Sequence, residues 1–116
     1  MNEIILLGRL TGKPAYKKTD SDLSIASFAI AIDRNGAKDK NGGKITDFPR
    51  VTVFGVQADN AHKYLDKGRL VLVKGHIQTG HYENESGDVV YTTSLIGDSV
   101  RYLDFSKETK DENEKE

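Results

Sequence analysis

Alternating apolar and polar side chains predict that most of this chain forms β-strands. The clearest case is Asp47–Gly55, where the two-residue period of a strand places Val51 and Val53 on one face. The opposite face then carries the alternate residues Phe48, Arg50, Thr52 and Phe54. The two valines suit a core, whereas two aromatic rings flanking an arginine are unusual for a solvated surface.

This pattern has two interpretations. Rings alternating with a guanidinium offer flat stacking surfaces and a cation, which suits the bases and phosphates of a single nucleic-acid strand. Alternatively, the strand lies between two packed layers, so that both faces are core and the long side chain of Arg50 reaches out to solvent. The rest of the chain has to decide between them.

The first third of the chain predicts two strands joined by a loop. Asn2–Leu10 contains a continuous apolar run, typical of a fully buried strand. Thr11–Asp22 is rich in turn-forming residues and predicts a loop that bears Lys13, Lys17 and Lys18. Leu23–Asp33 alternates again. Its apolar side would consist of Ala26, Phe28, Ile30 and Ile32.

The middle of the chain changes character twice. Arg34–Thr46, rich in Gly, Asn and Lys, offers no core face and predicts a long, mobile, cationic loop. Val56–Lys67 has helical spacing, and Gly68 stands where a helix C-cap glycine belongs. The apolar stripe of this helix would comprise Val56, Ala61, Tyr64 and Leu65, with Tyr64 in the core.

The last third predicts a long hairpin and one further strand. Arg69–Gln78 is strand-like and continues through Thr79–Tyr82 to a polar tip at residues 83–88. Val89–Ile96 would form the second arm, and Ser99–Leu103 a separate short strand in which Tyr102 is core. Strands with one helix between the third and fourth match the OB-fold, a five-stranded Greek-key barrel, here with a long hairpin between the fourth and fifth strands.

Composition narrows the functional classes. The 116 residues fit one domain, and the absence of cysteine excludes disulfides and thiolate metal sites. No apolar run is long enough for a membrane span, so we expect a cytoplasmic protein without a membrane partner. Residues 106–116 hold three lysines and five acids, which predicts a disordered acidic tail after a folded domain at 1–105. The domain is close to neutral, so nucleic-acid binding requires local clusters of cations.

Four stretches together resemble bacterial-type single-stranded-DNA-binding proteins. They cover nearly all of residues 1–105 in matching order and spacing, and they read MNEIILLGRLTGKP, SIASFAIAIDR, DFPRVTVFG and AHKYLDKGRLVLVKGHIQTGHYENESGDVVYTT. The resemblance implies a non-catalytic OB-fold protein that assembles as a homotetramer and wraps single-stranded DNA. It implies stacking aromatics at Phe48, Phe54 and Tyr82 and a basic residue at Arg50.

The chain departs from the family pattern in several places. It has no tryptophan, a further aromatic position falls near Asn35 and Gly36, and Glu3 replaces a basic residue. The arginine-rich start of the family's long hairpin reads HIQTGH here, in which Gln78 and His81 remain as polar candidates. The acidic tail lacks the usual Pro-Phe tip that recruits replication and repair proteins. These reductions resemble phage- or mobile-element-encoded members of the family.

Other chemistries fit poorly. GRLTGK has three residues between its glycines where a phosphate-binding loop needs four, and Pro14 stands where Ser or Thr would hold magnesium. His81-Tyr82-Glu83 matches the His-x-Glu of zinc deaminases, but these enzymes need cysteine ligands. His62, His76 and His81 are expected to be surface or DNA-facing residues and not metal ligands. We therefore expect no cofactor, no metal and no enzyme activity.

The sequence thus predicts sequence-independent binding and protection of single-stranded DNA during replication, recombination or repair. The proposed binding residues are Phe48, Arg50, Thr52, Phe54, Tyr82, Arg34, Lys38, Lys40, Lys44, Gln78 and His81. The protein would form a homotetramer, or alternatively a dimer, and could contact replication or recombination proteins. The alternatives are an OB-fold accessory protein of the primosomal type, or a protein-interaction module that binds nucleic acid weakly. A small nuclease is a more distant third.

Overall fold

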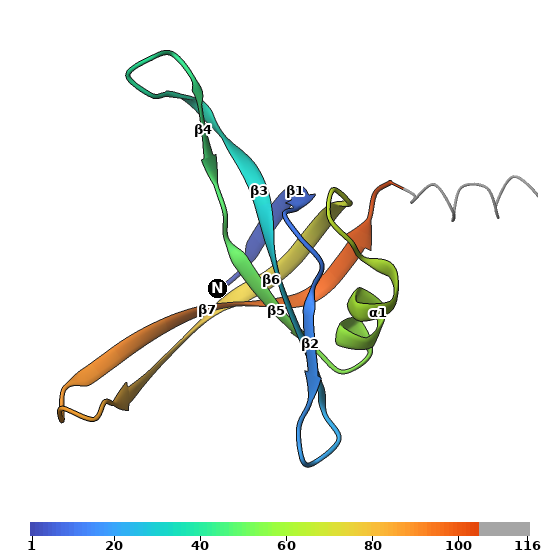
Figure 1. Ribbon diagram of the computed structural model, residues 1–116, viewed down its shortest axis with the longest axis vertical. Coiled ribbons are helices and arrows are strands. Elements are labelled where there is room, and N and C mark those ends of the chain that lie inside the picture. The colour runs from blue at the N-terminus through green and yellow to red at the C-terminus, as the bar shows by residue number, and fades with distance from the viewer. Residues whose placement is uncertain (105–116) are drawn as a thin grey trace, which may run out of the picture.

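A computed structural model describes residues 1–104 and shows a closed barrel of five strands, consistent with the predicted OB-fold (Figure 1). The strands follow one another in the order β1-β6-β7-β5-β3, and the ring closes where β1 pairs with β3. Strand β2 pairs with β3, and β4 extends β3 beyond the barrel. The elements are β1 (Ile4–Leu10), β2 (Ala15–Lys18), β3 (Ser24–Lys38), β4 (Lys44–Asp47), β5 (Arg50–Phe54), α1 (Val56–Tyr64), β6 (Leu70–Glu83) and β7 (Val89–Tyr102).

The core lies inside the barrel and consists of the inward-facing residues of its strands. The alternation predicted for the second strand is confirmed, because Ala26, Phe28 and Ile30 are buried and Ile32 packs against them. The largest fully buried side chains are Phe28, Ile30, Val51, Val53, Val71 and Val73. One face of each strand therefore stabilises the fold, and the other face is available for function.

Strand β1 differs from the prediction for Asn2–Leu10. The run was expected to be fully buried, but Ile5 and Leu7 are 65% and 51% exposed. Only alternate residues of β1 point into the barrel, since a barrel wall is a single layer. Within the described residues nothing covers the outer face of this strand.

Both predicted loops contain strands. Thr11–Asp22 includes β2, so Lys17 and Lys18 lie on a strand and only Lys13 lies in a loop. Arg34–Thr46 is largely the hairpin formed by the end of β3 and by β4. Pairing with β3 defines these strands, and each has only four residues, too few to show an alternating hydrophobic pattern.

The helix is shorter than predicted and differently oriented. It ends at Tyr64, Leu65 is already extended, and Gly68 lies beyond the helix, so it is not the C-cap. Ala58 and Ala61 are buried, whereas Tyr64 is 49% exposed and Val56 is exposed as well. Small residues face the barrel because α1 packs closely against β3 and β5. The expectation of Tyr64 in the core was therefore wrong.

The final strand was predicted as a separate element, but residues 99–102 continue β7. Opposite Lys74 and Gly75 of β6, strand β7 has one extra residue, Asp98, and this bulge lets β7 bend there without ending. A Cβ atom on Gly75 would lie only 1.8 Å from the carbonyl oxygen of Ile96, so only glycine fits at the bend. Tyr102 is half-buried and packs against the core, close to expectation.

The molecule has extents of 59 × 49 × 29 Å, and two long hairpins project from the barrel. The β3–β4 hairpin leaves one side of the barrel, and the β6–β7 hairpin leaves another (Figure 1). No helix among residues 1–104 is long and apolar enough to span a bilayer. The predicted acidic tail at 106–116 lies outside the described residues, and the domain boundary at 105 stays a prediction.

Candidate nucleic-acid interface

The outer face of β5 carries the aromatic row that the sequence predicted. Pairing with β3 keeps one register from Phe54 opposite Ile25 to Arg50 opposite Ala29, and it continues through Pro49, whose carbonyl accepts a hydrogen bond from the amide of Ile30. On the inner face Val51 and Val53 are completely buried. Phe48 and Phe54 are 62% and 39% exposed. The interpretation of β5 as a strand packed on both faces is therefore wrong for this chain.

Neighbouring strands extend this outer face on both sides. Thr52 lies beside Ser27 of β3 and beside Ile96 of β7, and Ile96 in turn lies beside His76 of β6. Directly paired residues point to the same side of a sheet, so these four side chains form one row across four strands. The Arg50 guanidinium donates a 3.3 Å hydrogen bond to Ser27 Oγ, which holds the cation over the sheet.

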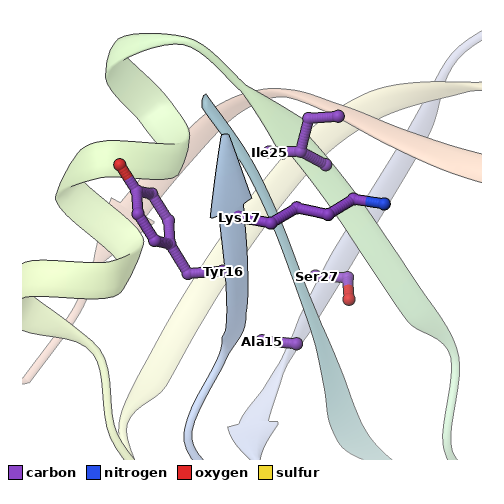
Figure 2. Close-up of a pocket in the computed structure, with 5 residues that line it drawn as sticks. All are labelled: Ala15, Tyr16, Lys17, Ile25 and Ser27. Atoms are coloured by element: carbon purple, nitrogen blue, oxygen red, sulfur yellow. The ribbon is translucent and has the colours of Figure 1, made fainter. Parts of the chain in front are cut away.

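A hollow of about 270 Å³ lies on the β2 side of this face. The side chains of Lys17, Ile25 and Ser27 project from the same side of the sheet, whereas the Tyr16 ring points toward α1 (Figure 2). Two residues that line the hollow, Ala15 and Ser27, have small side chains and face each other across β2 and β3. Ile25 lies beside Phe54, so the hollow adjoins the exposed ring of Phe54, and Lys17 is among its lining residues.

The Tyr16 side chain has a structural role, because its ring and its hydroxyl both contact α1. Its hydroxyl donates a 2.7 Å hydrogen bond to Asp59 Oδ1, and its ring stacks on His62 with centroids 4.1 Å apart and planes at 12°. Hydrogen bonds from the hydroxyl groups of Ser24 and Tyr16 hold the pKa of Asp59 below its usual value. Tyr16 thus joins β2 to α1 and lies away from the outer face of the sheet.

Four of the predicted cations, Arg34, Lys38, Lys40 and Lys44, lie on the β3–β4 hairpin. The aromatic row lies further along β3, where this strand pairs with β5. Arg34 and Lys44 are engaged in ion pairs with Asp47 and Asp33, whereas Lys38 and Lys40 have no ion-pair partner among residues 1–104. The bidentate hydrogen bond from Arg34 holds the pKa of Asp47 below its usual value. Half of the predicted cations are therefore partly neutralised by their own hairpin.

The β6–β7 hairpin separates two residues that the sequence grouped together. Gln78 and Tyr82 lie on the face that continues from Thr52 and Ile96, and Tyr82 is 55% exposed. His81 lies on the opposite face, beside Tyr91. Tyr82 and Gln78 can therefore extend the aromatic row of β5, and His81 cannot do so from its position.

His76 was not among the predicted binding residues, yet it lies in the row with Thr52. Its Nδ1 atom is 2.9 Å from Asp98 Oδ2, and its Nε2 atom is 3.4 Å from Gln78 Oε1. Hydrogen bonds to Asp98 and then Gln78 raise the pKa of His76 above its ordinary value. The signal that would have found it is its parity with Gln78 and Tyr82, two and six residues further along the strand.

Lys17, Ile25 and Ser27 were also missed as parts of the outer face. Ile25 and Ser27 lie on the side of the second strand opposite its predicted core residues, and no binding role was predicted for that side. Lys17 could not be placed, because β2 has only four residues and no apolar alternation. No group of histidine and carboxylate residues within 1–104 could hold a metal ion.

Comparison with known proteins assigns the chain to a family. The family model described as the single-strand binding protein family matches residues 1–103. The chain belongs to this family. Single-strand binding proteins from Staphylococcus aureus are among its relatives. Single-stranded DNA-binding protein 1 of strain Mu50 is 42% identical over 104 residues, and single-stranded DNA-binding protein 2 of the same strain is 38% identical over 104 residues.

The match covers 90% of this chain but 66% of the first of these relatives and 73% of the second. The chain thus spans just under two thirds of the length of the more similar of the two. The family match at residues 1–103 includes the whole barrel and both hairpins. The predicted resemblance to the single-strand binding protein family is confirmed.

Proposed function

We propose that this protein binds single-stranded DNA without sequence preference and protects it during replication, recombination or repair, without catalysis. The observation that supports this most directly is the solvent-exposed aromatic row formed by Phe54 of β5 and by Phe48 just before it. Phe48 and Phe54 expose their rings on the outer face of a closed barrel, with Arg50 between them and Val51 and Val53 buried beneath. Unpaired bases can stack on such rings, whereas bases in a duplex are already stacked on one another.

The other residues have graded roles in this proposal. Tyr82 supplies a third stacking ring, Thr52 and Gln78 offer hydrogen bonds, and Lys38 and Lys40 attract phosphates. Arg34 and Lys44 contribute less because each is paired with a carboxylate. Base-edge readout would need an ordered array of donors and acceptors, and the outer face offers mainly rings and small side chains, which supports binding without sequence preference.

The experiment that tests this function is an anisotropy titration with a labelled oligo-dT strand and a duplex of the same length, at two salt concentrations. We expect tight binding of the single strand, weaker binding of the duplex, and weaker binding at higher salt because phosphate contacts release counterions. Equal affinity for both nucleic acids would contradict the proposal. Weak binding without salt dependence would favour a protein-interaction module instead.

We further propose that the protein acts as a homotetramer, with a dimer as the alternative, in the cytoplasm. The support is the outer face of β1, where Ile5 and Leu7 are exposed and Leu7 lies beside Leu72 of β6. Apolar side chains gathered on one strand face are typical of a surface covered in an assembly. Sedimentation equilibrium should show an oligomer that dissociates when Leu7→Lys is introduced, and a monomeric parent protein would overturn this part. Replication and recombination proteins remain proposed partners.

A further inference from the structure

The β6–β7 hairpin exposes aromatic side chains on both of its faces. Pairing runs without a register shift from Gly75 opposite Gly97 to Glu83 opposite Val89. Successive residues of a strand point to opposite sides, so the face that carries Tyr82 cannot carry its neighbour His81. We call the side with His81 and Tyr91 the reverse face.

The reverse face begins as the inner surface of the barrel and becomes exposed where the hairpin leaves it. Leu95 lies beside the buried Val51 at the mouth of the barrel, and Ile77, paired with Leu95, is already 40% exposed. Further along, Tyr91 is 80% exposed, more than any other tyrosine or phenylalanine within residues 1–104. Within the described residues, no layer covers this part of the hairpin, which projects freely from the barrel (Figure 1).

No aromatic ring within residues 1–104 stacks in parallel on Tyr91. Its centroid lies 6.1 Å from that of His81, and the two planes are tilted by 50°. By contrast, the structural pair Tyr16–His62 is stacked nearly parallel at 4.1 Å. The tilt and the exposure leave a flat face of Tyr91 open to a planar ligand.

The surroundings favour a nucleic-acid strand as that ligand. Toward the barrel the next pair on the reverse face is Thr79 with Thr93, both exposed and able to donate hydrogen bonds to phosphate oxygens. The first carboxylate on this face is that of Glu83, one pair further toward the tip. A ring beside neutral donors suits a base and its phosphate better than an acidic surface would.

We propose that the reverse face binds a second stretch of the same single strand, with one base stacked on Tyr91. This inference rests on the proposed function, because the strand would first occupy the outer face of β5 and Tyr82. The hairpin is only two β-strands wide. A DNA strand that leaves Tyr82 therefore reaches the reverse face by turning around the edge of the hairpin. The hairpin would then act as a peg around which single-stranded DNA turns.

The test compares two oligo-dT lengths in anisotropy titrations of the full chain. A short strand, near the lower end of the ~4–16 nucleotides that an OB-fold covers, fills only the outer face, whereas a strand several times longer also reaches Tyr91. For Tyr91→Ala we expect unchanged affinity for the short strand and a loss on the order of tenfold for the long one. Tyr91→Phe, which keeps the ring, should retain the affinity for the long strand. Circular dichroism verifies that each variant is folded.

Each other outcome overturns the inference in a distinguishable way. An equal loss at both lengths would place Tyr91 in the outer-face site, and no loss at either length would leave the reverse face without a role in DNA binding. A change in sedimentation behaviour of Tyr91→Ala, with long-strand affinity per protomer preserved, would identify the reverse face as an interface between copies. If the unaltered protein binds neither strand, the proposed function fails, and this inference fails with it.

Discussion

The two hairpins of this protein project from the same barrel and contain different chemistry. The β3–β4 hairpin has four cations and three carboxylates between residues 33 and 47 and no aromatic side chain, whereas the β6–β7 hairpin has tyrosines on both faces and few cations. On the first, the carboxylates of Asp33 and Asp47 pair with Lys44 and Arg34. On the second, Tyr82 and Tyr91 stay exposed.

The difference indicates how binding is divided between them. Stacking acts at contact distance and depends little on salt, while phosphate attraction acts over longer range and is screened. We therefore expect the β6–β7 hairpin to determine how long a strand stays bound, and the β3–β4 hairpin to determine how fast it arrives. The predictions below test this division, beginning with the largest expected effect.

Removing the ring of Tyr82 should weaken oligo-dT binding by roughly 1–3 kcal/mol, the usual contribution of one stacked base. The slope of log K against log salt should stay unchanged in Tyr82→Ala, because no charge is removed. Anisotropy titrations over a salt series measure both quantities. A lower slope with unchanged affinity would assign an electrostatic role to this hairpin and remove the contrast between the two.

Removing Lys38 and Lys40, which form no ion pair within residues 1–104, should have the opposite signature. Lys38→Ala with Lys40→Ala should lower the salt slope by about 1.4, from ~0.7 for each contact with a single-strand phosphate. The affinity should fall at low salt and converge with that of the parent protein at high salt. Asp47→Asn, which frees Arg34 from its ion pair, should instead raise the slope. Parallel salt dependence in all three proteins would contradict the assigned role of the β3–β4 hairpin.

The stability of the two hairpins where they leave the barrel should respond to pH in opposite directions. This is the smallest effect of the three predictions. The pKa of His76 is raised above 6.5 by Asp98, so the pair stabilises the β6–β7 hairpin most below that pH and less as pH rises through the folded-state pKa. The pKa of Asp47 is lowered from 3.8 by Arg34, so that pair stabilises the β3–β4 hairpin above 3.8 and is lost as pH falls through the folded-state pKa.

Amide hydrogen exchange at the barrel-proximal end of each hairpin, corrected for intrinsic rates, measures these responses separately. His76→Gln should abolish the dependence near neutral pH and leave the acid dependence in place, and Asp47→Asn should do the reverse. A shared pH response of both hairpins would mean that they open together with the barrel and not independently.

Parts of this molecule that depend on the apolar pattern were predictable from sequence. The buried Val51 and Val53 and the exposed Phe48 and Phe54 follow directly from a period of two. The pattern failed where an apolar run alone had to decide burial. Ile5 and Leu7 look like core in sequence, but the wall of a barrel has only one inner face.

The parts that the sequence did not predict depend on backbone pairing and on twist. Strands β2 and β4 exist because β3 is long enough to pair with them, and their own residues give no hydrophobic signal. His76 joined the outer face through its partner Ile96, a contact between residues 20 apart in the chain. Tyr64 was misplaced because the small residues Ala58 and Ala61, not the large ones, set the packing face of α1.

The most direct test of the central claim is the affinity of Phe48→Ala with Phe54→Ala for oligo-dT. Tyr64→Ala serves as the matched control, since it removes an exposed ring on α1 away from the outer face. Melting curves verify that both variants are folded. We predict that the double variant loses roughly 2–6 kcal/mol of binding free energy, from about 1–3 for each ring, while the control binds like the parent protein. Unchanged affinity in a folded double variant would contradict the assignment of this face to single-stranded DNA.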